Sequence, residues 1–399
     1  MASQPEVHGL VAPGFEAVRE AFADNLQRRG ELGAACALTH HGELVVDLWG
    51  GVRDPATQAP WDEDTLVLVY SVAKGASALV LGHLHDRGLL DYDATVASYW
   101  PAFAEAGKEA ITVRQLLDHQ AGLAVIDTKL TPAVLADVDG LAPILARQAP
   151  LHEAGTRHDY HAISLGFYQS ELVRRVDPEG RTLGRYLADE LAAPLDVTCW
   201  IGLPDDVPAT QVAPIETLNP LGMIFHPKSL SPRLIGALAN PWSLTTRALR
   251  NPRLPGPAAL DAPAYRAVEM PASNAITNAR AMVRLYAAFL EGGTALGISA
   301  DTRARFAAPP TLPPAGTWDR VFHRHTAYDL GFMKPCRDFR FGSDDRAYGA
   351  PGLGGSFAFA DPATASAYAY VTNRLGYSVF DEPRERALRD ACVAALRRA

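Results

Sequence analysis

Strand-like segments lie near both ends of this 399-residue chain, and a long helical stretch separates them. Apolar runs at 34–39 and 44–49 flank a turn at 40–43, which predicts a β-hairpin. Two further strands are predicted near the other end, at 356–360 and 367–372. We therefore expect an α+β architecture, in which one antiparallel sheet is assembled from both chain ends around a helical insertion.

Helical spacing of apolar residues predicts the helices that flank this sheet. Those near the chain ends are expected at 15–29, 71–86, 279–290 and 382–398. The stretch between them is expected to be mainly helical, most clearly at 113–117, 165–176 and 183–191. A proline-rich stretch with few clear elements, 219–263, is interpreted as a functional loop or lid. The expected division is a first α/β region, a helical region and a second α/β region, at 1–90, 91–274 and 275–399.

Composition narrows the classes of partner and location. The net charge is −8 and no block is rich in lysine or arginine, which argues against a nucleic-acid partner. No apolar run is long enough to span a membrane, and residues 1–13 lack the apolar core of a secretion signal, so we expect a cytoplasmic protein. No dinucleotide-binding glycine pattern, P-loop or H-E-x-x-H sequence occurs, so no cofactor and no metal are expected. The oligomeric state is left open.

The sequence Ser71-Val72-Ala73-Lys74 is an S-x-x-K element at the start of a predicted helix. Residues three apart share one helix face, so the Lys74 amine can reach the Ser71 hydroxyl. A serine hydroxyl needs a base to become a good nucleophile, and a lysine can be that base when burial lowers its pKa. The alternative is an N-cap serine followed by a surface lysine. With only five lysines in the chain, a chance match is uncommon.

Two later segments could complete such a site. Tyr160 lies in the sequence 158–162, just before a predicted helix, and a tyrosine beside the nucleophile can relay a proton to the leaving group. Its simpler interpretation is an amphipathic tyrosine at a domain edge. The glycine-rich segment 348–356 leads into a predicted strand, where a substrate can approach the backbone closely. Its simpler interpretation is a tight turn.

The order of these elements resembles the serine β-lactamase and penicillin-binding-protein superfamily, and most closely its class C-like branch, which includes family VIII carboxylesterases. The segment 116–123 also resembles that family's LLxHxSGL sequence, with Ala121 in place of the serine. The resemblance implies a β-lactamase-like fold with its active site in a cleft between the sheet and the helical region. It implies that Ser71 is the nucleophile, Lys74 its activating partner and Tyr160 the proton relay. It also implies an oxyanion hole built from the backbone N–H groups of Ser71 and Leu353.

Two departures from the family pattern bear on the substrate. The family's Tyr-x-Asn appears here as Tyr160-His161-Ala162, and its Lys/His-Thr-Gly appears as Ala350-Pro351-Gly352. In members that handle β-lactams, the missing groups hold the side-chain amide and the carboxylate, and alanine can bind neither. We therefore predict a small neutral ester that lies against Ala162, Ala350 and Gly352. The alternatives are an acyltransferase, peptidase or β-lactamase with the same catalytic residues, or a non-catalytic binding module.

Overall fold

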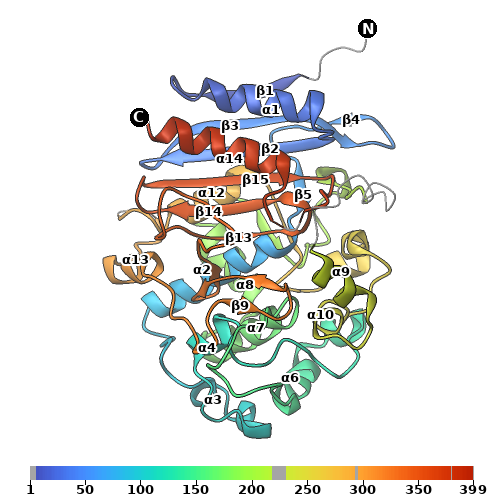
Figure 1. Cartoon of the computed structure of the whole chain (residues 1–399), viewed down its shortest axis with the longest axis vertical. Helices are drawn as coiled ribbons and strands as arrows, with labels where there is room; N and C mark the ends of the chain where they lie inside the picture. The colour runs from blue at the N-terminus through green and yellow to red at the C-terminus, as the bar shows by residue number, and fades with distance from the viewer. Residues whose placement is uncertain (1–5, 218–230, 293–294, 379, 399) are drawn as a thin grey trace.

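The computed structural model describes residues 6–217, 231–292, 295–378 and 380–398, and a large antiparallel sheet dominates its upper region in Figure 1. Within the described residues this sheet has nine strands. Their order across it is β1 (Val7–Val11), β3 (Glu43–Asp54), β2 (Gly33–His40), β15 (Ser366–Thr372), β14 (Phe357–Asp361), β13 (Tyr348–Pro351), β12 (Phe332–Met333) and β11 (Tyr328–Asp329), with β4 (Ala59–Pro60) paired to β3.

The pairing of β2 with β15 joins the two ends of the chain, as predicted. Cys36 lies opposite Tyr370 in this pair. Ala367 donates its backbone N–H to the Thr39 hydroxyl, although the two residues are 328 positions apart in the sequence. Both strands are buried along nearly their whole length, as expected for strands with helices on both faces of the sheet.

Helices from both chain ends cover the sheet. In Figure 1, α1 (Glu16–Arg28) and α14 (Pro383–Leu396) lie side by side on the near face, and α12 (Ala279–Ala287) packs on the far face against β2, β14 and β15. These helices lie within a few residues of their predicted bounds. The remaining α-helices are α2 (Ala73–Asp86), α3 (Val96–Tyr99), α4 (Val113–Leu117), α5 (Pro132–Ala136), α6 (Val138–Arg147), α7 (Ser164–Val176), α8 (Leu183–Tyr186), α9 (Pro232–Ala239), α10 (Leu244–Leu249), α11 (Pro263–Arg266) and α13 (Ala300–Ala307).

Three features differ from the sequence prediction. The helix expected at 183–191 changes after Tyr186 into a π-helix, η3 (Leu187–Ala192). The expectation of few clear elements at 219–263 is wrong for its later portion, which contains α9 and α10 and ends where α11 begins, while 219–230 lies outside the described residues. A second sheet also went unpredicted, because its strands are too short to show a period: β6 (Cys199–Ile201), β8 (Ala275–Thr277), β5 (Leu66–Leu68) and β7 (Val212–Ala213). A two-stranded ribbon, β9 (Trp318–Asp319) with β10 (Arg324–His325), adds to these.

The α2 helix lies deep inside the molecule because most of its own side chains, on all its faces, are small or apolar. Gly75 is one reason for the close packing: a Cβ atom there would lie 2.0 Å from the Tyr286 hydroxyl of α12. Gly82 has the same role about two turns further along the helix, where a Cβ atom would lie 2.3 Å from the Phe306 ring. These contacts fix α2 against the core, and Lys74 lies beside the first of them. None of the described helices has both the length and the apolar character to cross a bilayer.

Candidate active site

Ser71 lies in a tight 3-10 turn, η1 (Tyr70–Val72), that leads into α2. The α-helix was predicted to begin at Ser71, but it begins two residues later, so the serine precedes it. Tyr70 has a φ of 49°, a left-handed conformation that is uncommon for residues other than glycine. This turn leaves Ser71 half-buried directly after the bend, where its hydroxyl can meet a substrate.

Lys74 is 3% exposed, and its amine lies among three oxygen atoms. Nζ donates to the carbonyl oxygens of Ala162 at 2.7 Å and Ala272 at 2.8 Å, and it lies 3.3 Å from Ser71 Oγ. Burial lowers the pKa of Lys74 well below its ordinary value. A neutral amine has two N–H groups and one lone pair. In that form the two N–H groups match the two carbonyls, and the lone pair would face the hydroxyl of Ser71.

Tyr160 completes the hydroxyl's surroundings. Burial raises its pKa above the ordinary tyrosine value, and the neighbouring Ser71 side chain offsets part of that rise. The Lys74 amine lies 4.7 Å from the centroid of the Tyr160 ring. A tyrosine with a raised pKa stays a protonated phenol at neutral pH, so Tyr160 can donate a proton but cannot begin as the base. The directions of the two pKa shifts favour Lys74 over Tyr160 as a base.

Buried histidines hold the segment that carries Tyr160. His119 Nδ1 accepts the backbone N–H of His161 at 2.9 Å, so the His119 proton is on Nε2. His161 Nε2 accepts the N–H of Leu123 at 3.0 Å, and its Nδ1 donates to the carbonyl of Asp159 at 2.6 Å. Burial lowers the pKa of both histidines, to about 4 for His161, so both are neutral at pH 7. The His119 ring also packs 4.8 Å from the Tyr160 ring.

The glycine-rich segment follows β13 and packs against the turn that carries Ser71. A Cβ atom on Gly352 would lie 2.4 Å from the carbonyl oxygen of Val69 and 3.1 Å from the side chain of Val72, so this glycine packs directly on the Ser71 turn. Leu353 opens the 3-10 turn η7 (Leu353–Gly355), and the first N–H of such a turn has no partner inside it. The N–H of Ser71, the second residue of η1, also has no partner inside its turn, because the bond that closes η1 runs from the Val72 N–H to the Val69 carbonyl. These two donors are the candidates for an oxyanion hole.

The residues predicted for the substrate site lie close to this machinery. Ala162 is buried and contributes its carbonyl oxygen to Lys74, and Ala350 is buried against α2, where a Cβ atom on Gly75 would lie 3.3 Å from its own. Sequence reasoning missed Ala272, which acts through its backbone carbonyl and so gives no side-chain signal. It also gave His119 no role, although that residue lies in the segment 116–123, whose family resemblance was a usable signal.

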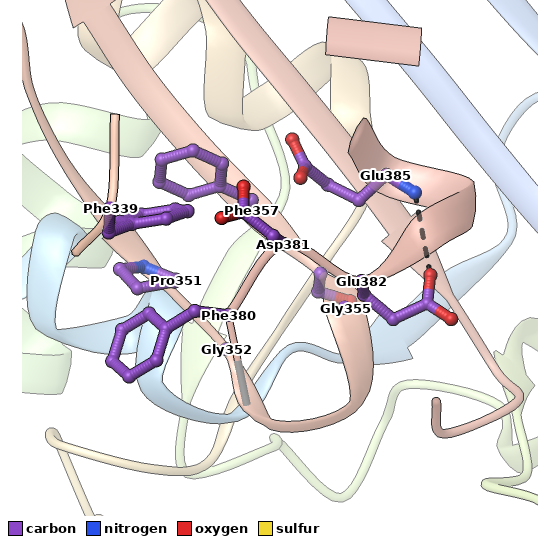
Figure 2. A pocket seen from close by; sticks show the side chains of 10 residues that line it. Phe339, Pro351, Gly352, Gly355, Phe357, Phe380, Asp381, Glu382 and Glu385 are labelled. Atoms are coloured by element: carbon purple, nitrogen blue, oxygen red, sulfur yellow. Dashed lines mark hydrogen bonds between the residues drawn. The ribbon is translucent and has the colours of Figure 1, made fainter. Parts of the chain in front are cut away.

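A small pocket borders the glycine-rich segment at Pro351 and Gly352. Figure 2 shows the rings of Phe339, Phe357 and Phe380 around Pro351, with Asp381 next to Phe357 and the side chains of Glu382 and Glu385 to the right. Each of these carboxylates is paired with an arginine: Asp381 and Glu385 with Arg389, and Glu382 with Arg384. The pocket therefore has no free charge to offer a ligand. Across the described stretches of the chain, no group of three or more histidine, cysteine, aspartate or glutamate side chains could hold a metal ion.

The chain is similar to known proteins over nearly its whole length. A family model described as Beta-lactamase matches residues 18–393. The Esterase/beta-lactamase LipL of Mycobacterium tuberculosis (strain ATCC 25618 / H37Rv) is 34% identical over 373 residues, which are 92% of this chain and 83% of that protein. The crystal structure of a family VIII carboxylesterase is 35% identical with a TM-score of 0.84, over 98% of this chain and 100% of the other. A penicillin-binding-protein homolog from Caulobacter crescentus is 35% identical with a TM-score of 0.82, over the same shares.

Proposed function

The chain belongs to the β-lactamase family and is a serine hydrolase of that type, and we propose that it cleaves small carboxylic esters through an acyl-enzyme on Ser71. The predicted β-lactamase-like α+β fold and family resemblance are confirmed. One observation carries the proposed residue roles: the Lys74 amine has its N–H groups on two carbonyls and faces the serine hydroxyl.

The proposed reaction has two halves. In the first, the Ser71 hydroxyl gives its proton to Lys74 while Oγ attacks the ester carbonyl, and the N–H groups of Ser71 and Leu353 stabilise the oxyanion. The carbon–oxygen bond to the alcohol then breaks, Tyr160 donates a proton to the departing oxygen, and Lys74 returns its proton to Tyr160. The second half reverses these steps with water in place of the alcohol: Tyr160 passes its proton to Lys74 as it takes one from the water, and the water oxygen attacks the acyl carbonyl. The bond to Ser71 Oγ then breaks, Lys74 returns a proton to Oγ, and the carboxylic acid leaves.

A neutral ester is the proposed substrate because Ala162 and Ala350 give no polar side chain to a β-lactam. A β-lactam carboxylate loses hydration in the cleft, and without a cationic partner that cost is uncompensated. One missing charge-assisted hydrogen bond corresponds to about ten- to a hundredfold in kcat/KM. We expect p-nitrophenyl butyrate to be hydrolysed orders of magnitude faster than nitrocefin under the same conditions. Equal or faster nitrocefin turnover would overturn this substrate assignment.

Acyl transfer to an alcohol or amine uses the same residues, and it is the alternative reaction. It is distinguished by analysing products in the presence of added alcohols. Peptidase activity and simple binding are further alternatives, and the latter predicts no turnover of any ester. A cytoplasmic location, and the absence of a nucleic-acid partner, stay predictions from the sequence.

The test of the nucleophile is covalent labelling. Exposure to a fluorophosphonate should add one label, and peptide mapping should locate it on Ser71. The Ser71→Ala variant should take up no label and lose ester turnover. A label on another serine, or turnover by Ser71→Ala at the wild-type rate, would contradict the assignment.

A further inference from the structure

An aromatic side chain outside the proposed catalytic set lies directly against the proton donor. Phe322 is half-buried, and its ring packs on that of Tyr160 with centroids 4.3 Å apart and planes 31° from parallel. Tyr160 itself is almost fully buried, so Phe322 forms the partly exposed surface next to it. We therefore expect a group attached to the oxygen that Tyr160 protonates to lie close to the Phe322 ring.

The turn that carries Phe322 is held in place from both sides. The Asp319 carboxylate accepts the backbone N–H of Val321 at 2.8 Å and that of Phe322 at 2.9 Å. The Thr245 hydroxyl, from α10, donates to the carbonyl of Val321 at 2.8 Å. The ring is thus positioned by backbone contacts on both flanks, which is how proteins keep a binding side chain in place before a ligand arrives.

Phe322 also continues into a wall of aromatic rings. Its ring meets that of Phe380 at 5.2 Å, nearly edge to face, and Phe380 in turn meets Phe339 at 5.2 Å. Figure 2 shows Phe380 beside Pro351 and Gly352, so this wall extends from the proton donor to the glycine-rich segment. Arg324 stacks on Phe380, with its guanidinium carbon 4.0 Å from the centroid, and so backs that ring rather than leaving it free.

We propose that Phe322 is the floor of a subsite for the alcohol half of the ester, and that this subsite selects aromatic alcohols such as benzyl and phenyl groups. The inference rests on the proposed ester hydrolysis, because the alcohol oxygen is the atom that Tyr160 protonates. An aromatic ring on that oxygen can stack on Phe322, whereas a saturated ring gains only contact area.

The subsite makes a prediction about alcohols of similar reactivity. Benzyl butyrate and cyclohexylmethyl butyrate both release a primary alcohol of similar size, and they differ in aromaticity. We expect the wild type to prefer the benzyl ester by roughly three- to tenfold in kcat/KM, the scale of one aromatic pair. Phe322→Leu should reduce that ratio to near one, and Phe322→Tyr, which keeps the ring, should retain it.

A second measurement separates binding of the alcohol from support of Tyr160. Both esters give the same butyryl-enzyme, and the alcohol has left before water attacks. Phe322→Leu should therefore change the ratio of the two acylation rate constants, whereas the deacylation rate constant of each protein is the same for both esters. A Phe322 that only positions Tyr160 would slow both halves for both esters, since Tyr160 moves protons in each.

Transfer of the butyryl group from the enzyme to an added alcohol gives a third measurement of the subsite. Added benzyl alcohol should divert the butyryl-enzyme into benzyl butyrate more than cyclohexylmethanol does, and Phe322→Leu should abolish the difference. Equal use of the two alcohols by the wild type, or an unchanged ratio in Phe322→Leu, would overturn the subsite. Failure of Ser71 to acylate with any ester is a different result, because it would overturn the proposed hydrolysis instead.

Discussion

Two buried lysines allow the catalytic role of one to be separated from its structural role. Lys74 donates to two carbonyls and faces Ser71, whereas Lys108, also buried, donates to the three carbonyls of Glu105, Ala146 and Gln148 at 2.6–2.8 Å. Three carbonyl acceptors match an ammonium group, while two carbonyls and a hydroxyl match a neutral amine that can take a proton. We therefore compare Lys74→Met with Lys108→Met, since methionine keeps most of the chain length but has no donor.

The two variants should lose stability to a similar degree. Lys74→Met leaves two buried carbonyls without a donor, and Lys108→Met leaves three. Each such carbonyl costs about 1–3 kcal/mol, and removal of a buried amine offsets some of that cost. A loss of about 2–5 kcal/mol is expected for either variant, which a domain of ordinary stability survives.

Activity should separate the pair. Lys74→Met should lower the acylation rate by about a hundredfold to ten-thousandfold, as for loss of a general base, and Lys108→Met should stay within about threefold of the wild type. Urea denaturation gives the stabilities, and the burst of p-nitrophenol from p-nitrophenyl butyrate gives acylation by the folded protein. In the wild type, acylation should rise with pH as the lowered pKa of Lys74 is passed, because only the neutral amine accepts a proton.

The result that refutes this reasoning is a small difference between the two variants. If Lys74→Met acylates within about tenfold of the wild type, then Lys74 is not the base. If Lys108→Met loses as much activity as Lys74→Met, then the loss follows from a disturbed fold and not from the missing base.

Three further predictions follow from contacts described above. Gly75→Ala places a Cβ atom 2.0 Å from the buried Tyr286 hydroxyl, so it should lower the free energy of unfolding, measured by urea denaturation, by about 1–3 kcal/mol and slow acylation. In the control Gly236→Ala on α9 the added Cβ atom meets nothing within 4 Å, so the free energy of unfolding should stay unchanged or rise by up to about 1 kcal/mol. Equal effects of the two variants would contradict the packing argument. Tyr160→Phe should lower kcat by about a hundredfold with little change in stability, and a loss below about threefold would remove Tyr160 as proton donor. Burial raises the pKa of Asp319 to about 7, so the folded state keeps a proton that the unfolded state loses near pH 4. Between pH 4 and 7 the free energy of unfolding of the wild type should therefore fall relative to that of Asp319→Asn, by up to about 4 kcal/mol. Parallel pH–stability curves for the two proteins would show that this carboxyl does not titrate in that range.

The sequence allowed the long elements and the side-chain chemistry to be predicted, because both leave local patterns. The hairpin at β2 and β3 and the helices α4 and α7 follow from apolar periodicity, and Ser71 and Lys74 share a helical spacing. Backbone roles could not be predicted in this way. The carbonyl of Ala272 reaches Lys74 only because the chain folds back beside α2, and an alanine carries no sign of that.

The aromatic neighbours of the site show the same limit. Phe322 comes 162 positions after Tyr160, and no periodicity links a turn residue to a tyrosine in another segment. Only the tertiary packing brings their rings to 4.3 Å. The π-helix after α8 is a similar case, since tertiary contacts rather than local propensity decide between helical forms over so few residues.

Because strands from both chain ends form one sheet, the sheet can be completed only late in protein synthesis. Thr39 in β2 can pair with Ala367 in β15 only after a further 328 residues have been synthesised, which takes roughly 15 to 65 s at about 5–20 residues per second. Until then one edge of β2 has no hydrogen-bonding partner strand. The β13 strand and the glycine-rich segment, which pack on α2 and the Ser71 turn, have also not yet been synthesised. We therefore expect the nascent chain to carry Ser71 from early in synthesis but to become active only when almost the last strand has emerged, and an open strand edge is exposed to pairing with other chains during that interval.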